Sequence, residues 1–592
     1  MRPDPHSYYD TEQAAVRSLE MKLDVDFSGR RLAGRARLDF GVAARSRIDL
    51  DTRDLTILRV NDEQNRPLQW ELGDPDPILG SRLRVSLPHP TARIDVAYQT
   101  SPEASALQWL EPAQTKGGSQ PFLFSQCQQI HARSMVPMQD TPVVRVPYMA
   151  EISVPEGLTA VMSAGPEGSI RGHRPGMRTF LFRMPQPIPS YLLALAVGRL
   201  ESRDLCDRSR VYAEPETVEA AAWEFAGIEA MIQKAESLFG PYEWDRYDMI
   251  VLPPAFPFGG MENPRLTFLT PTLLAGDRSL VTVVAHELAH SWTGNLVTNA
   301  TANDFWLNEG FTVWAERRII EALEGPEAAA MSYGLGEIRM RNALDRFGED
   351  SPYTRLRMDL DGVDPDDIFS EIAYEKGSLL VVTLERLAGR ERFDRFIRSY
   401  MDRFRFTSIT TEQFVEFLRS EMPDVAGQVD LKTWLYEPGL PPGRPEFRSE
   451  ELEEVTRWAA RWPEGKRPPQ NVIERWTPQD VLLYLQRLPQ EMAGSDCAWL
   501  DENLSLTGQG NYEILVAWLT IASSSGYEPA LPRVREVLTE VGRMKYLRPL
   551  YLALGRHGRT RDLARETFAE VKGTYHATSR RAVEEVLAEY PA

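Results

Sequence analysis

The first 200 residues alternate between apolar and polar positions with a period of two, in short runs separated by turn signals. Residues 83–87, 94–98 and 180–184 are three such runs, each with apolar side chains at every second position. Proline, glycine and aspartate cluster between runs of this kind, for example in residues 73–77. Alternation bounded by turns is typical of half-buried strands, so the pattern predicts an N-terminal β domain over residues 1–200.

The period changes to that of a helix near residue 218. Residues 219–238 predict one amphipathic helix, and helical patterns continue to about Trp434. One strand-like run, residues 248–252, interrupts them and ends in a proline-rich loop. The pattern predicts a mixed α/β domain over residues 201–437.

A segment that cannot continue a helix follows this domain. Four prolines and two glycines fall within residues 438–445 and predict a linker over residues 438–449. Residues 450–592 are helical throughout, in segments of about 12 to 16 residues, which predicts an all-α domain of stacked helix pairs resembling an armadillo-type solenoid. Because 592 residues are too many for one core, we expect a multidomain α+β protein.

One motif in the mixed domain carries recognisable chemistry. Residues 284–290 read Val-Ala-His-Glu-Leu-Ala-His, and Glu309 lies 19 residues after His290. His286 and His290 are four residues apart, so on a helix their imidazoles point at one spot, beside Glu287. Two imidazoles, a carboxylate from a second helix and an open position are typical of a catalytic zinc site. Glu287 would take the proton of the water that attacks a carbonyl.

The alternative is a surface helix with two solvated histidines. With only 8 His in 592 residues, a chance match to the motif is expected in roughly one such chain in a hundred. Apolar residues surround the motif on most of the helix: Leu280, Val281, Val283, Val284, Leu288, Ala289 and Trp292. Such a helix is expected to be buried, where unpaired polar groups are costly. A metal site is therefore the preferred interpretation, and the donor types favour zinc over manganese or cobalt.

Composition limits the classes of binding partner and the cellular compartments that we expect. The net charge of −19 argues against nucleic acid and against an anionic membrane surface as partners. Cys127, Cys206 and Cys497 are scattered and predict no disulfide framework. The start of the chain lacks the pattern of a signal peptide, and no run of 18 apolar residues occurs. We expect a cytoplasmic protein without a membrane span; the oligomeric state stays open, a monomer included.

A second motif, Gly259-Gly260-Met261-Glu262-Asn263, precedes the zinc motif. With it the chain resembles the M1 family of zinc aminopeptidases, and within that family it is most similar to the branch that contains leukotriene A4 hydrolase. Other blocks similar to this branch lie at residues 125–131, at the zinc motifs, and at residues 373–377, 438–442 and 542–545, and they occur in the same order along the chain as in the branch. The resemblance implies a saddle-like N-terminal β-sheet domain, a thermolysin-like catalytic domain with one zinc ion, and a C-terminal helical-repeat domain.

The resemblance also implies roles for individual residues. Glu262 would hold the free α-amino group of a peptide, with Gln126 and Gln128 shaping the same pocket. Tyr374 would donate a hydrogen bond to the oxyanion. The candidate site is then Glu287 and Tyr374 for catalysis; His286, His290 and Glu309 for the metal; and Gln126, Gln128, Gly259, Gly260, Met261, Glu262, Asp366, Arg543 and Lys545 for the substrate.

Four residues outside the zinc motifs also receive roles. Arg543 and Lys545 would meet the C-terminal carboxylate of a short peptide, arginine in the bidentate manner. Glu316, two helical turns past Glu309, would support a ligand imidazole. Asp366 falls where the branch has an acid that lines its inner pocket.

Each assignment has a plainer alternative. Gly259 and Gly260 could form only a turn, and Tyr374 could be a core tyrosine with a satisfied hydroxyl. Arg543 and Lys545 could be a solvated helix face. Residues 364–367, which include Asp366, could be an exposed turn. Cys127, between two candidate glutamines, is interpreted as a small buried residue.

Departures from the branch decide between activities. Phe369 and Phe258 stand where tyrosines are usual, and Ala302 stands where a tryptophan lines the fatty-acid pocket. The sequence therefore predicts an aminopeptidase that trims short peptides with a free N-terminus. The first rival is a bifunctional enzyme that also hydrolyses a lipid epoxide. The second is a catalytically dead scaffold, against which the intact Glu287 and Tyr374 argue.

Overall fold

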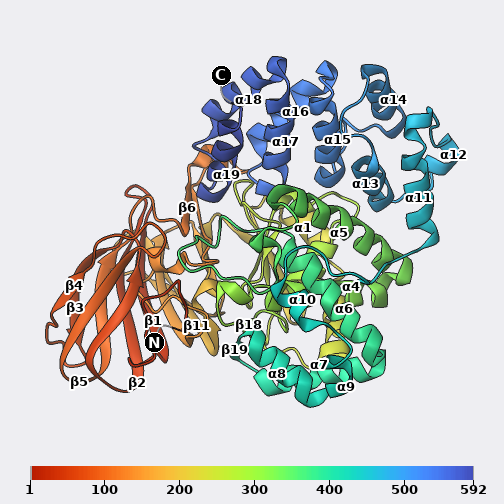
Figure 1. Cartoon of the computed structure of the whole chain (residues 1–592). Coiled ribbons are helices and arrows are strands. Elements are labelled where there is room, and N and C mark those ends of the chain that lie inside the picture. Colours follow the sequence, from red (N-terminus) through yellow and green to blue (C-terminus); the bar gives the residue numbers. More distant parts are fainter. Residues whose placement is uncertain (1–2, 591–592) are drawn as a thin grey trace.

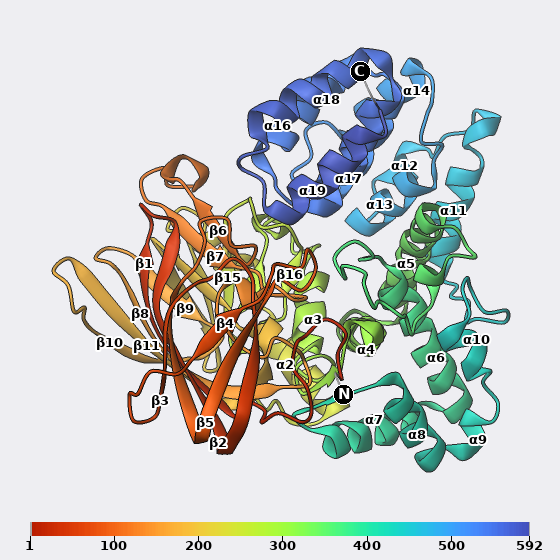
Figure 2. The same cartoon turned by 60° about the vertical axis from the view of Figure 1, so that its left-hand side comes forward.

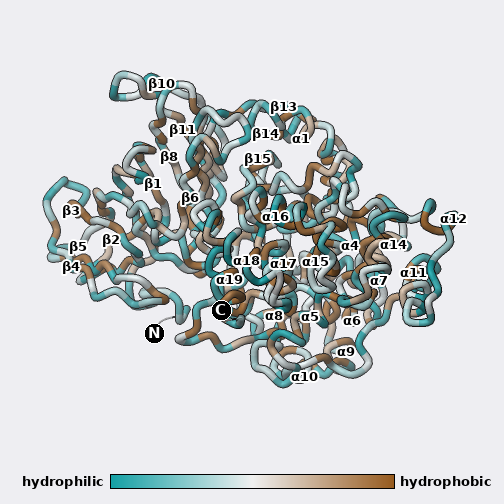
Figure 3. Tube along the Cα trace, turned by 90° about the horizontal axis from the view of Figure 1, so that it is seen from above, coloured by the Kyte–Doolittle hydropathy of each residue, from teal (hydrophilic) through white to brown (hydrophobic). Residues whose placement is uncertain are grey.

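The computed structural model describes residues 3–590, in three parts that follow one another along the chain (Figure 1). The red and orange strands of the first part lie beside the green middle part, and the blue helices of the last part lie above it in both views (Figures 1 and 2). Apolar segments occur in every part (Figure 3), and each part has a hydrophobic core of its own. No helix among residues 3–590 has the length and apolar character needed to cross a membrane.

The N-terminal part is built from two sheets. The larger has eight strands: β1 (Ser18–Asp26), β2 (Arg31–Thr52), β3 (Thr56–Asp62), β4 (Trp70–Leu72), β5 (Ser81–Gln99), β8 (Arg145–Pro155), β10 (Gly165–Arg171) and β11 (Met177–Pro189). Their order is β10-β11-β8-β1-β2-β5-β3, with β4 on β5. The smaller sheet has the order β6 (Leu107–Leu110), β7 (Phe122–Ser125), β12 (Leu195–Gly198) and β9 (Thr159–Met162). Burial alternates residue by residue along β1, as the period of two predicts.

Two strands that the sequence pattern separates form one continuous strand in the structure. Residues 83–87 and 94–98 both belong to β5, which pairs with the slightly longer β2 over both runs. The register shifts between them, where Pro88 and Pro90 lie. Proline cannot donate to a ladder, so an irregularity in the pairing accommodates both prolines without ending the strand.

The middle part places a small sheet beside a set of helices. The sheet has the order β13 (Glu201–Cys206), β14 (Ser209–Ala213), β15 (Met249–Val251), β17 (Thr267–Leu269) and β16 (Gly260–Met261). A separate pair consists of β18 (Val297–Asn299) and β19 (Thr407–Ile409). The helices are α1 (Val218–Glu224), α2 (Ile228–Phe239), α3 (Thr282–Ala289), α4 (Trp306–Glu324), α5 (Pro326–Phe347), α6 (Gly377–Ala388), α7 (Arg390–Phe404), α8 (Thr411–Glu421), α9 (Pro423–Ala426) and α10 (Leu431–Tyr436). A π-helical turn, η7 (Ile372–Lys376), leads into α6.

The single helix predicted for residues 219–238 is wrong, because the chain breaks into α1 and α2. The carboxylate of Glu224, at the end of α1, accepts hydrogen bonds from the backbone N–H groups of Gly276 (3.1 Å) and Arg278 (2.8 Å). Gly227 then precedes the first residue of α2. The helical period continues through the break, which is why the sequence pattern does not reveal it.

The C-terminal part is helical, as predicted. Its helices are α11 (Glu450–Ala460), α12 (Gln470–Ile473), α13 (Pro478–Arg487), α14 (Gly494–Leu504), α15 (Tyr512–Ser524), α16 (Leu531–Glu540), α17 (Met544–Arg556), α18 (Gly558–Val571) and α19 (Ala577–Ala588). Several are shorter than predicted, and prolines mark the start of two of these: Pro469 directly precedes α12, and Pro478 is the first residue of α13. Ser449 caps α11 by accepting a hydrogen bond from the N–H of Leu452 (3.1 Å).

Candidate metal centre and active site

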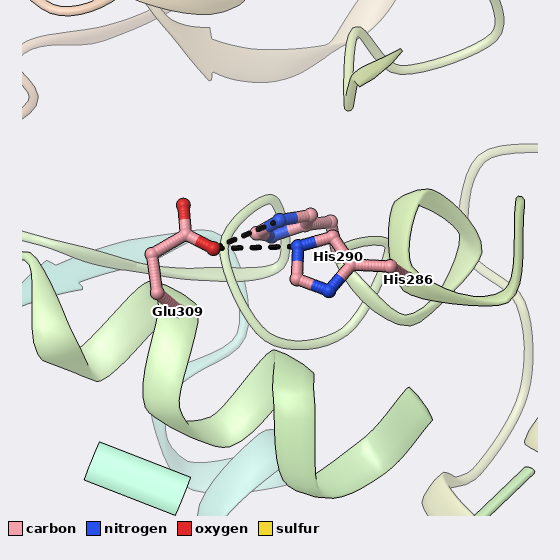
Figure 4. Close-up of side chains that lie close together, drawn as sticks. All are labelled: His286, His290 and Glu309. Carbon is pink, nitrogen blue, oxygen red and sulfur yellow. Dashed lines mark ion pairs between the residues drawn. The ribbon is translucent and has the colours of Figure 1, made fainter. Parts of the chain in front are cut away.

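The three predicted metal ligands come from α3 and α4. His290 follows the last residue of α3 with helical backbone angles (φ −55°, ψ −23°), so its ring stays on the same side as that of His286. The two ring centroids are 4.8 Å apart. Each Nε2 atom lies 3.4 Å from Oε2 of Glu309, and Figure 4 shows both imidazoles facing that carboxylate. The structure therefore brings these three side chains together.

Hydrogen bonds to Nδ1 of His286 and of His290 determine which ring nitrogen can bind a metal ion. Nδ1 of His286 lies 3.0 Å from Oε2 of Glu316. Nδ1 of His290 lies 3.0 Å from the carbonyl oxygen of Thr293 and 3.1 Å from Oγ1 of Thr312. An Nδ1–H that donates to such acceptors leaves Nε2 free of a proton, as a metal ligand requires.

The donor set fits a zinc ion. Oε2 of Glu309 is buried and has no hydrogen-bond partner in the described part of the chain, a costly state for an anionic oxygen unless a cation compensates it. The ligand atoms of His286, His290 and Glu309 all lie within 4.8 Å of one another. Two imidazole nitrogens and one carboxylate oxygen are the usual protein ligands of a catalytic zinc.

Two further buried carboxylates face the same place. A carboxylate oxygen of Glu262, one of Glu287 and a ring nitrogen of His290 lie within 4.8 Å of one another. Burial raises the pKa of Glu287 to about 7, against the opposing effect of His286 and His290. Burial also raises the pKa of Glu262. A pocket so rich in buried carboxylates favours a metal ion and a positively charged group of the substrate.

Two glycines let the chain at β16 approach these groups. A Cβ atom added at Gly260 would lie 2.3 Å from Oε1 of Glu287, and one added at Gly259 would lie 2.6 Å from Nη2 of Arg543. At either distance a Cβ atom would displace the carboxylate of Glu287 or the guanidinium of Arg543 from its present position. Close packing against functional groups, rather than a turn alone, therefore explains both glycines.

Two glutamines of the N-terminal domain contact Met261 and Glu262, at the end of β16. Nε2 of Gln128 donates to Oε1 of Glu262 (3.2 Å), which is 4% exposed. Nε2 of Gln126 lies 3.3 Å from Sδ of Met261. Gln128 thus touches the carboxylate itself, whereas Gln126 touches only the neighbouring side chain.

Tyr374 lies in η7, beside the histidines. Its ring centroid is 6.0 Å from that of His286, with the planes 20° apart. Its hydroxyl makes no hydrogen bond among those of residues 3–590, which argues against the alternative of a satisfied core tyrosine. Burial, reinforced by the nearby Glu309 and Glu371, raises the pKa of Tyr374 well above its usual value. The hydroxyl therefore keeps its proton at neutral pH and can donate it to an oxyanion.

Arg543 and Lys545 converge on Glu513 of α15. Nη1 of Arg543 lies 3.2 Å from Oε1 of this carboxylate, and Nζ of Lys545 lies 2.8 Å from Oε2. Burial alone would raise the pKa of Glu513, but Lys545 and Arg543 hold it at about 2. Arg543 is 4% exposed, so the alternative of a solvated helix face is wrong for it. Lys545 is more open, with 43% of its side chain exposed.

Asp366 does not lie in an open turn. Its Oδ2 is 2.8 Å from Nε2 of His131, and the two side chains are 20% and 12% exposed. Cys127 is buried as predicted, and burial raises the pKa of its thiol. The rings of Phe258 and Phe369 lie 6.0 Å apart, so two of the departures from the leukotriene branch are neighbours.

Sequence reasoning missed three residues that hold this site. Thr293 and Thr312 contact His290, and Nδ2 of Asn295 donates to the backbone carbonyl of Glu262 (2.7 Å). Thr312 could have been found, because it lies three residues after Glu309 on the same face of α4. Thr293 and Asn295 come from the loop after α3, and no pattern marks them.

A buried two-histidine, one-carboxylate donor set with an adjacent glutamate, set between a β domain and a helical domain, defines a zinc metallopeptidase. The family models agree in chain order. "Peptidase M1 N-terminal domain" matches residues 5–192, "Peptidase family M1 domain" matches residues 223–434, and "Leukotriene A4 hydrolase, C-terminal" matches residues 476–587. The chain belongs to peptidase family M1, the zinc aminopeptidases, as its motifs predict.

Relatives cover nearly the whole chain. A leukotriene A-4 hydrolase of Xenopus laevis is 38% identical over 602 residues, which is 98% of this chain and 98% of that protein. Leucine aminopeptidase 2 of Yarrowia lipolytica is 37% identical, over 99% of this chain and 93% of that protein. The structure of a yeast LTA4 hydrolase in complex with bestatin matches 99% of this chain and 97% of its own, with a TM-score of 0.91 at 33% identity. The three-domain fold and the zinc-dependent aminopeptidase class are confirmed.

Proposed function

We propose that the chain removes single residues from the free N-terminus of short peptides in the cytoplasm, with one zinc ion per chain. The observation that carries the proposal is the position of Glu262. This carboxylate is buried within 4.8 Å of Glu287 and His290, and none of the ion pairs among residues 3–590 includes it. A substrate ammonium at this place would neutralise it, and an internal peptide segment has no such group.

The remaining residues have roles that follow from their contacts. A zinc ion held by His286, His290 and Glu309 would polarise the scissile carbonyl and make water a better nucleophile. Glu287, whose pKa burial raises to about 7, would accept the proton of the attacking water and pass it to the departing amine. Tyr374 would donate a hydrogen bond to the oxygen that becomes negative.

Arg543 supports the preference for short peptides. Gly259 and Gly260 are consecutive, and their contacts put Nη2 of Arg543 no more than about 12 Å from Oε1 of Glu287. An extended peptide advances about 3.4 Å per residue, so a carboxylate two to three residues beyond the cleaved bond would reach the guanidinium. Lys545, 43% exposed, would add a second cation there. We infer that tripeptides are cleaved faster than long unfolded chains such as casein.

The decisive experiment compares aminoacyl-arylamides with their N-acetylated counterparts, with and without a zinc chelator. We expect cleavage of the free-amine set only, and its loss with the chelator. Equal cleavage of the acetylated set would mean that Glu262 is no amine anchor and that the protein is an endopeptidase. Cleavage of neither set would overturn the proposal. Glu287→Gln is the matched control, which should keep zinc and lose activity.

A second candidate is hydrolysis of a lipid epoxide, favoured by the similarity to a leukotriene A-4 hydrolase. Asp366, the acid that the resemblance places in the inner pocket, is engaged by His131 at 2.8 Å. Phe369 and Ala302 replace the aromatic residues of that pocket. Incubating the purified protein with a lipid epoxide decides this candidate; we expect no turnover above the rate without protein.

A further inference from the structure

The ring of Tyr374 contacts the rings of His286, Phe305 and Phe369. Its hydroxyl has no hydrogen-bond partner among residues 3–590, so the turn that carries Tyr374 also determines where this hydroxyl lies. The next residue, Glu375, is 3% exposed. Both of its carboxylate oxygens accept hydrogen bonds from Nη2 of Arg317 at 2.9 Å. Oε1 also accepts one from Nη2 of Arg339 at 2.6 Å. One carboxylate is thus held by two guanidinium groups directly beside the candidate oxyanion donor.

The two arginines tie this turn to the rest of the site. Arg317 belongs to α4, two helical turns past the metal ligand Glu309. Arg339 belongs to α5. A Cβ atom added at Gly336 would lie 2.3 Å from Oε2 of Glu375 and 2.5 Å from Nη2 of Arg317. The absence of a side chain at Gly336 therefore makes space for this ion pair. Helix α4, which carries the metal ligand Glu309, is therefore bonded through Arg317 to the turn η7, which carries Tyr374.

The two arginines favour the charged form of the Glu375 carboxylate. Burial alone would raise the pKa of Glu375, but Arg317 and Arg339 keep it below its ordinary value, so the carboxylate is ionised at neutral pH. A buried ion pair of this kind is weak evidence for stability, because removing charges from water is costly. A role in fixing geometry accounts for it better.

We propose that Glu375, gripped by Arg317 and Arg339, is a positioning residue that sets the distance between the Tyr374 hydroxyl and the metal ligands. The inference rests on the proposed role of Tyr374 in hydrolysis. Glu375 touches neither substrate nor metal, and it acts only through the turn η7. Its loss therefore affects stabilisation of the transition state rather than binding of the ground state.

The test starts with Glu375→Gln, which keeps the shape of the side chain and removes its charge. We expect kcat for an aminoacyl-arylamide to fall about 10- to 100-fold, with KM within about threefold and zinc content unchanged, because a displaced oxyanion donor loses part of the two to three powers of ten that such donors supply. The matched control is Glu385→Gln. Glu385 is also buried and pairs with Arg318, the next residue on α4, at 2.9 Å, but it lies outside η7, so kcat should stay within about twofold.

A double-mutant cycle separates positioning from general damage. If Glu375 acts through the Tyr374 hydroxyl, Glu375→Gln should lower kcat less than twofold in a Tyr374→Phe background. An equal loss in both backgrounds would overturn the inference, and so would a loss confined to KM. Arg339→Met, at a side chain that is 32% exposed, provides a second variant should Glu375→Gln fold poorly; it should show a smaller loss that also vanishes with Tyr374→Phe. An inactive wild type would instead refute the proposed function.

Discussion

At the scale of single residues, Glu262 gives the sharpest expectation. Replacing Glu262 with glutamine leaves a buried ammonium without its counter-charge, so kcat/KM for free-amine arylamides should fall by about 3 kcal/mol or more, a factor above about 100. Steady-state kinetics on the purified variant measures this. Glu385→Gln removes another buried carboxylate, which is 7% exposed and pairs with Arg318 instead of facing the metal ligands, and should leave kcat/KM unchanged within about twofold. Normal cleavage by Glu262→Gln would refute exopeptidase action.

Glu316 gives a second expectation, which concerns the metal. Its Oε2 lies 3.0 Å from Nδ1 of His286, and it orients the ring and raises the basicity of Nε2. Glu316→Gln should weaken zinc binding about 10- to 100-fold, measured by competition with a chelator of known affinity. Glu321→Gln, on the same helix at a partly exposed position, serves as the control. Equal zinc affinity in all three proteins would leave Glu316 without a supporting role.

Spacing alone identifies only residues that lie close together along the chain. His286, Glu287 and His290 lie within five residues of one another, and one helical period places them around one point. The ion pair between Arg317 and Glu375 joins positions 58 residues apart, and although Glu375 lies in the block at residues 373–377, Arg317 belongs to no motif. Pairings of that kind depend on how α4 packs against η7, so they become visible only in three dimensions.

At the scale of elements, the turn η7 is fixed on its other side by Lys376. This side chain is fully buried, and its Nζ donates to the carbonyl oxygens of Thr354 and Glu437, at 3.0 Å each. Burial, with a contribution from Arg355, lowers the pKa of Lys376 to about 7. The unfolded chain, with the ordinary lysine pKa near 10.4, binds more protons than the native protein between those values. Stability from this group therefore rises with pH above 7.

The expected result is a pH-dependent difference between the wild type and Lys376→Met. From pH 7 to pH 9 the wild type should gain up to about 3 kcal/mol relative to the variant, seen as a widening gap between their melting temperatures in calorimetry. Lys234→Met changes an exposed lysine and should show a constant gap. A gap that narrows with rising pH would contradict the burial of an uncharged amine.

Element types were easier to predict than element limits. The period of two and the period of 3.6 locate the β, mixed and helical parts of the chain correctly. The same periods merge α1 with α2 and divide β5, because the break in a helix depends on the contacts of Glu224 and the length of a strand depends on its partner β2. Periodicity reports which side of an element is buried, and distant partners decide where the element ends.

At the scale of the whole molecule, all three domains contribute side chains near one point. Gln128 comes from the N-terminal domain, Glu262 from the middle domain and Arg543 from the C-terminal domain. The family blocks in the sequence mark each of these residues, yet they do not reveal how the domains dock. Docking here uses backbone groups: the N–H of Gly542 donates to the carbonyl of Pro254 at 2.8 Å, and that of Met544 donates to the carbonyl of Pro257 at 2.9 Å.

The docking at Gly542 should determine how the protein recognises the far end of a peptide. A Cβ atom there would lie 2.8 Å from Cα of Ala255, so Gly542→Ala should push the helical domain away and displace Arg543. We expect kcat/KM for a tripeptide to fall about 10- to 100-fold, the value of a charge-assisted hydrogen bond. Aminoacyl-arylamides, which have no C-terminal carboxylate, should be cleaved as before.

Substrate and variant controls make this expectation specific to the carboxylate. The wild type should prefer a tripeptide acid to the corresponding tripeptide amide, and Gly542→Ala should lose that preference because the amide has no charge for Arg543 to meet. Gly494→Ala adds a methyl group in open space in the same domain and should keep the preference. If Gly542→Ala slows arylamides as much as tripeptides, the docking supports the catalytic groups as a whole, and the limit on peptide length must come from elsewhere in the cleft.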